Sequence, residues 1–133
     1  MGGTSSIADF IEMLKRAREQ VNTSSCMETI GRCNDLITKS VKLALKKAGS
    51  EISGPFTLNQ LKEAGLPDWY LERVKEACLE AGVLPLCAFI LDVPRYNKGC
   101  TKLDAKRAVD AAEKIVEATK KFLVSVRGDK DEG

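Results

Sequence analysis

The residues best suited to bind a ligand lie just before the last helix that the sequence predicts. The segment 92–99 reads Asp-Val-Pro-Arg-Tyr-Asn-Lys-Gly and is followed closely by Thr101. An arginine can bind a phosphate through two hydrogen bonds, and a tyrosine can stack on a base. Arg95, Tyr96, Lys98 and Thr101 are therefore the candidate ligand-binding residues. The alternative, which we favour slightly, is structural: Arg95 binds carbonyls or a carboxylate of the adjacent helix, and Tyr96 packs into the bundle.

The start of the last helix adds to this candidate site. The backbone N–H groups of residues 101–104 point back toward the segment, and the positive end of the helix dipole favours an anion there. Pro94 stiffens the approach and Gly99 permits the turn into the helix. The carboxylate of Asp104 already interacts with the positive end of this helix. We therefore expect an anion to bind with a Kd in the micromolar range or weaker, worth at most about 8 kcal/mol.

The sequence contains no histidine, and this restricts the chemistry available to the protein. Ser-His and Cys-His nucleophile pairs, histidine general bases and histidine metal sites are excluded. Four carboxylates recur at helical spacing beside lysines in the last helix; they are Asp104, Asp110, Glu113 and Glu117, with Lys106, Lys114, Lys120 and Lys121. This pattern is typical of exposed ion pairs rather than of a metal cluster. We predict no catalytic residue, metal or cofactor.

The five cysteines form no Cys-x-x-Cys pair. Cys26 and Cys33 would be about 10 Å apart along a helix axis, which is too far for a disulfide. We therefore expect reduced cysteines and a cytoplasmic protein. Cys100 precedes a helix that could lower its thiol pKa, although a plain small residue is the simpler interpretation.

Three further polar or aromatic positions have two interpretations each. An exposed Trp69 at a helix start would indicate a contact surface, whereas a half-buried Trp69 would only fix the helix. Asn34 and Asp35 lie beside an apolar stripe, where they either line a polar cleft or face solvent.

The element that must position the candidate site is the last helix, predicted over 101–127. Its apolar residues recur at steps of three and four, which places them on one face; they are Ala105, Ala108, Ala112, Ile115, Thr119, Phe122 and Val126, widened by Val109, Val116 and Leu123. Thr101 and Asp104 form a capping-box pattern, and Gly128 suits the position after the helix end. The rest of the chain is expected to cover this helix.

The remaining helices follow from similar signals. The sequence predicts helices over about 6–21, 25–48, 57–65 and 67–81, joined by short turns. Residues 83–91 are almost wholly apolar, so periodicity cannot separate a strand from a buried helix. No second strand candidate is present for pairing, and we therefore predict a short helix that begins near Pro85.

These predictions describe an all-α protein, an up-and-down four-helix bundle with a short helical insert. Residues 6–128 form one domain, and residues 1–5 and 129–133 are expected to be flexible termini. The net charge of +2 gives no electrostatic case for general nucleic-acid binding. No apolar run approaches the roughly 18 residues of a membrane span, so no membrane association is predicted.

The order of these features resembles the HEPN family (higher eukaryotes and prokaryotes nucleotide-binding). One matching part is a helix that ends in a lysine cluster and Gly49, followed by a loop and Thr57-Leu58. The other is the turn Val93-Pro94-Arg95-Tyr96 before a final helix of the form Ala-x-x-Ala-Ala-Glu-Lys-Ile-Val-Glu. The matching features span roughly residues 25–123, and the Arg-Tyr dipeptide is the most specific of them.

The resemblance implies an all-α bundle, usually a homodimer, with a polar cleft near the dimer interface. It implies a binding module that acts with a small nucleotidyltransferase partner or binds a nucleotide. Two alternatives stay open: a HEPN-type ribonuclease toxin that cuts RNA with an atypical site, and a helical interaction module without a ligand. The ribonuclease branch carries Arg, four to six residues, then His, and Arg95 has no such histidine after it.

Overall fold

All the regular structure in the described part of the chain is helical, as the sequence predicts. The structure, a computed structural model, describes residues 7–50, 56–81, 84–91 and 100–132. Its helices are α1 (Ile7–Glu19), α2 (Cys26–Lys47), α3 (Leu58–Glu63), α4 (Asp68–Glu80), α5 (Pro85–Leu91) and α6 (Lys102–Glu132). The ambiguous apolar run therefore contains a helix, α5, that begins at Pro85.

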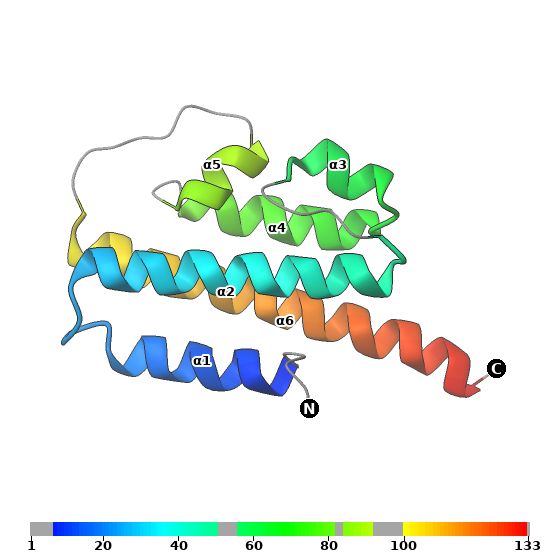
Figure 1. The fold of residues 1–133 in the computed structure, drawn as a ribbon, viewed down its shortest axis with the longest axis horizontal. Helices are drawn as coiled ribbons and strands as arrows, with labels where there is room; N and C mark the ends of the chain where they lie inside the picture. Colours follow the sequence, from blue (N-terminus) through cyan, green and yellow to red (C-terminus); the bar gives the residue numbers. More distant parts are fainter. Residues whose placement is uncertain (1–6, 51–55, 82–83, 92–99, 133) are drawn as a thin grey trace.

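Helix α6 is the element around which the described helices assemble, because α1, α2 and α4 all pack against it (Figure 1). The predicted apolar face is buried from Ala105 to Phe122. Ala111 and Ala118 are buried as well, so the buried surface is wider than one stripe. A helix covered from several directions needs such a wide apolar surface, and its alanines let neighbouring backbones approach closely.

Helices α2 and α6 form the most extensive contact, and they run parallel (Figure 1). Their first turns lie together, with the Cα atoms of Cys26 and Cys100 only 5.8 Å apart. Helices α1 and α4 flank α6 on different sides, and each runs antiparallel to it (Figure 1). This arrangement makes a groove along α6 on each side, one toward α1 and one toward α4.

Local capping explains where three helices begin. Ser25 and Glu28 form a complete capping box at α2, Thr57 and Gln60 form one at α3, and Thr101 and Asp104 exchange the same two hydrogen bonds at α6. Each box satisfies backbone N–H groups that a helix start leaves without partners. The capping predicted for Thr101 and Asp104 is confirmed, and the predicted starts near residues 25 and 57 coincide with the other two boxes.

Helix α5 is held in place by a residue from α2. The side-chain oxygen of Asn34 accepts a hydrogen bond of 2.8 Å from the N–H of Leu86, in the first turn of α5. A seven-residue helix is too short to be stable alone. Asn34 and the buried side chains of Leu86 and Ile90 therefore fix α5 to the rest of the molecule.

The predicted end of the last helix is wrong. Helix α6 continues through Gly128 to Glu132 and does not end before Gly128. An interior glycine costs a helix only about 1 kcal/mol, which a long helix tolerates.

Among the helices that the structure describes, none combines the length and the apolar character needed to span a membrane.

The prediction of reduced cysteines is also wrong. Cys26 is disulfide-bonded to Cys100, and Cys78 is disulfide-bonded to Cys87. Cys33 is buried and free. Cys26 and Cys100 are 74 positions apart and meet only through the packing of α2 on α6, whereas Cys78 and Cys87 are 9 positions apart, in the consecutive helices α4 and α5.

Candidate functional site

Of the four predicted ligand-binding residues, the structure describes only Thr101. Arg95, Tyr96 and Lys98 lie outside the described residues. Thr101 is exposed, and its hydroxyl accepts a hydrogen bond of 3.2 Å from the N–H of Asp104. The Asp104 carboxylate in turn accepts a 3.0 Å hydrogen bond from the N–H of Thr101. Both side chains of this candidate anion site are therefore already engaged in capping α6.

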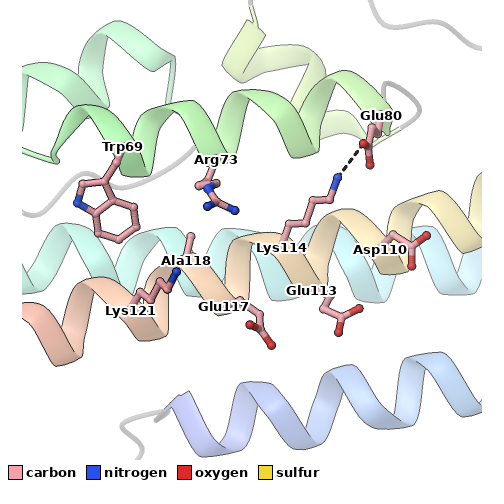
Figure 2. A pocket seen from close by; sticks show the side chains of 9 residues that line it. All are labelled: Trp69, Arg73, Glu80, Asp110, Glu113, Lys114, Glu117, Ala118 and Lys121. Carbon is pink, nitrogen blue, oxygen red and sulfur yellow. Dashed lines mark hydrogen bonds and ion pairs between the residues drawn. The ribbon is translucent and has the colours of Figure 1, made fainter.

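A groove between α4 and α6 is a second candidate site, and the described residues build it fully (Figure 2). Its volume is about 420 Å³. Nine residues line it: Trp69, Arg73, Glu80, Asp110, Glu113, Lys114, Glu117, Ala118 and Lys121. Small-molecule sites commonly have volumes of about 300–1,000 Å³, so the groove has room for one small ligand.

At one end of the groove, the carboxylates are ion-paired between helices: one pair joins α4 to α6, and two join α6 to α1 on its other side. Lys114 of α6 binds Glu80 of α4 at 2.7 Å (Figure 2). Arg18 of α1 binds Asp110 at 3.0 Å and Glu113 at 2.6 Å. These contacts neutralise three of the four groove carboxylates. The residues at this end therefore join helices and offer little to a ligand.

The other end carries an exposed aromatic ring and two cations that lack partners in the part of the chain that the structure describes. Trp69 is 40% exposed. Among the described residues, Arg73 and Lys121 form no ion pair or hydrogen bond through their side chains. Glu117 also lacks such a partner, and its carboxylate points toward α1 rather than toward α4 in Figure 2. The Trp69 end thus has a local excess of positive charge.

Helical spacing and the antiparallel packing place these side chains together. Trp69 and Arg73 are four positions apart on α4, and Glu117 and Lys121 are four apart on α6, so each pair lies on one face. Trp69 packs edge-on against the ring of Tyr70 at 6.0 Å, and Tyr70 is buried. The indole is therefore anchored at one edge while its remaining surface faces the groove.

The other positions noted in the sequence have structural roles. Asn34 binds the start of α5, and Asp35 forms an exposed ion pair of 3.1 Å with Lys39. Cys100 is in a disulfide. Trp69 is the exception, because its exposure supports the contact-surface interpretation. Sequence reasoning missed Arg73 and assigned Lys121 to an ion-pair pattern; the four-residue spacing of Trp69 and Arg73 was the available signal.

Two buried side chains outside the groove have raised pKa values. Burial raises the pKa of Cys33 to about 12, against smaller lowering effects of Arg18 and Arg32. Burial also raises the pKa of Tyr70, and its hydrogen bond with Thr119 lowers it less. Both shifts keep these groups neutral, and neither side chain lines the groove. The groove residues can bind charge and stack on a ring.

No family model matches the chain. No curated protein and no solved structure matches it either.

Proposed function

We propose that the protein is a HEPN-like helical binding module that takes a nucleotide, or another small phosphorylated aromatic ligand, in the groove between α4 and α6. The observation that carries this proposal is that exposed Trp69 lines the same groove as Arg73 and Lys121, which have no partner within the described part of the chain. We also propose that the helices form the up-and-down four-helix bundle that the family resemblance implies. The all-helical structure is compatible with it.

The chemistry of the groove suits the two halves of a nucleotide. An indole offers a face on which any base can stack, worth about 1–3 kcal/mol. Arg73 can bind phosphate oxygens through two hydrogen bonds, and Lys121 adds a mobile positive charge. Because neither cation has a partner among the described residues, a phosphate bound here need not displace a described ion pair, and solvent screens the attraction.

Binding without catalysis is the form of the proposal that we favour. Ribonuclease chemistry without a metal needs a group that titrates near neutral pH to take the 2′-hydroxyl proton. The chain has no histidine, and the groove carboxylates Glu80, Asp110 and Glu113 are ion-paired. The atypical ribonuclease and the ligand-free interaction module remain the competing functions.

The partners in the proposal come from the family resemblance. They are a second copy of the chain and a small nucleotidyltransferase, with a nucleotide or RNA as the ligand. The sequence also led us to propose a cytoplasmic location. The two disulfides argue against an ordinary reducing cytoplasm and favour a compartment in which thiols are oxidised.

The proposal can be tested with the protein's own fluorescence, because Trp69 is its one tryptophan. Mono- and dinucleotides titrated at low salt should quench this fluorescence with a Kd in the micromolar to millimolar range. Arg73→Gln should raise the Kd about ten-fold, equivalent to roughly 1.4 kcal/mol. Arg107→Gln, an exposed arginine of α6 outside the groove, is the matched control and should leave the Kd unchanged.

Two further outcomes separate the competing functions. Quenching that survives Arg73→Gln but disappears in Arg95→Ala would move the site to the segment before α6. Cleavage of RNA by the purified protein, abolished by Arg95→Ala, would establish the ribonuclease. No response at millimolar nucleotide in any form of the protein would overturn the nucleotide proposal and favour the interaction module.

A further inference from the structure

We infer that the disulfide between Cys26 and Cys100 is a redox-sensitive clamp on the first turns of α2 and α6, and that it opens while the disulfide between Cys78 and Cys87 stays closed. This inference is independent of the groove and its ligand. It depends on where the two disulfides lie in the fold, how exposed each is, and which helix ends they join.

The two disulfides differ in access. Cys26 and Cys100 are only partly buried, at the end of the molecule where α2 and α6 begin. Cys78 and Cys87 are both 0% exposed, between α4 and α5. Thiol–disulfide exchange requires a thiolate to reach a sulfur atom directly. A reductant can therefore attack the first pair in the native fold, whereas the second pair needs local unfolding.

The two disulfides also differ as leaving groups. Cys26 is the first residue of α2, and Cys100 lies two residues before α6 begins. Helix N-termini stabilise thiolates, and a stabilised thiolate leaves faster during exchange. At Cys26 the carbonyl oxygen of Thr101, 3.1 Å from Sγ, opposes part of this effect, so the difference in access is the main argument. Cys78 and Cys87 lie in apolar surroundings, which disfavour the thiolate. Cys33 is buried with a raised pKa, so it does not compete as an internal thiol.

The reaction is a two-electron exchange with a dithiol or glutathione-type reductant. A reductant thiolate attacks one sulfur and the Cys26–Cys100 bond breaks, which leaves a mixed disulfide and one free protein thiolate. A second reductant thiol releases the other cysteine. Two protein thiols form, after taking up two protons, and the reductant becomes a disulfide.

Opening the disulfide between Cys26 and Cys100 should lower the stability of the fold more than opening the disulfide between Cys78 and Cys87. The Cys26–Cys100 bond closes a loop with a sequence separation of 74, against 9 for the other pair. Closure of the longer loop constrains the unfolded chain more. The buried contacts of Ala105, Ala108 and Val109 keep α6 packed after reduction, so the protein stays folded but less stable.

The test traps the thiols of the native protein. Protein purified without reductant is incubated in graded dithiothreitol, alkylated, digested and analysed by mass spectrometry. We expect alkylation of Cys26 and Cys100 at reductant concentrations at least ten-fold below those needed for Cys78 and Cys87. Oxidised glutathione should restore the disulfide. The melting temperature should fall by about 10 °C when only this pair is open.

Paired variants provide the controls. Cys26→Ser with Cys100→Ser should melt at the lower temperature with and without reductant. Cys78→Ser with Cys87→Ser should keep the reductant-dependent shift. Equal thresholds for the two pairs, earlier opening of the buried pair, or free Cys26 and Cys100 before reductant is added would each overturn the inference.

Discussion

At the scale of single residues, the contact between Tyr70 and Thr119 links α4 to the centre of α6. Their hydroxyl groups are 2.8 Å apart, and both residues are 0% exposed. Water cannot replace this hydrogen bond, so each hydroxyl depends on the other. Tyr70 also contacts the ring of Phe122 at 5.9 Å, which keeps its aromatic ring in place.

We expect Tyr70→Phe to lower the free energy of unfolding by about 1–2 kcal/mol, because it leaves the Thr119 hydroxyl buried without its partner. Urea denaturation gives the value. In a double-mutant cycle with Thr119→Val, the double variant should be less destabilised than the sum of the single variants. Strict additivity would mean that the two hydroxyl groups do not stabilise each other.

The sequence identified some of the candidate-site residues but not their combination. Trp69 was noted from the sequence because a tryptophan at a helix start either forms a contact surface or fixes the helix. Arg73 and Lys121 are 48 positions apart and become neighbours of one groove only when α4 packs antiparallel to α6. Pairing between helices decides which lysines and arginines are left without partners, and a single sequence does not specify that pairing.

At the scale of elements, the end of α2 shows how one residue stops a helix. Gly49 has a φ of 87°, the left-handed conformation. The N–H of Ser50 binds the carbonyl of Leu45 at 2.9 Å, and the N–H of Gly49 binds that of Lys46 at 3.0 Å. These bonds satisfy carbonyl groups that the helix end would otherwise leave open.

Substitution of two glycines by alanine should therefore have opposite effects. Gly49→Ala should destabilise the protein by about 1 kcal/mol, because an L-residue with a Cβ disfavours positive φ. Gly31→Ala, inside α2, meets no atom within 4 Å and should stabilise it by about 0.5–1 kcal/mol. Thermal denaturation of both variants measures the contrast; a loss at Gly31 equal to that at Gly49 would contradict it.

Local signals predicted the starts of α2, α3 and α6, since each capping box lies within four consecutive residues. The end of α6 was misplaced, because Gly128 carries the same local signal as Gly49 without stopping the helix. The disulfide between Cys26 and Cys100 was missed for a different reason. Only the parallel packing of α2 on α6 brings Cys26 to Cys100, and short turns between successive helices do not reveal it.

At the scale of the whole molecule, the absence of histidine should make stability almost independent of pH near neutrality. No side chain has an ordinary pKa between about pH 5.5 and 8, so folding changes proton binding little there. The buried groups with raised pKa values, Cys33 and Tyr70, become important at higher pH.

Both raised pKa values make the folded protein less stable as the pH rises. In the unfolded chain these groups lose their protons near 9.0 and 10.0, whereas burial keeps them protonated in the folded protein. The unfolded state thus binds fewer protons above about pH 9, and the free energy of unfolding falls as pH rises. For Cys33 the contribution is complete below about pH 9 and is lost as pH rises toward about 12.

Urea denaturation at intervals from pH 6 to 10.5 measures this profile. We expect a plateau to about pH 8.5 and a decline above it. Cys33→Ala should make the decline between pH 9 and 10 shallower, and Tyr70→Phe should act mainly above pH 10, because the unfolded pKa of tyrosine is higher. If both variants kept the wild-type decline of the free energy of unfolding with pH, Cys33 and Tyr70 would not cause it. The loss of stability at high pH would then arise from other groups.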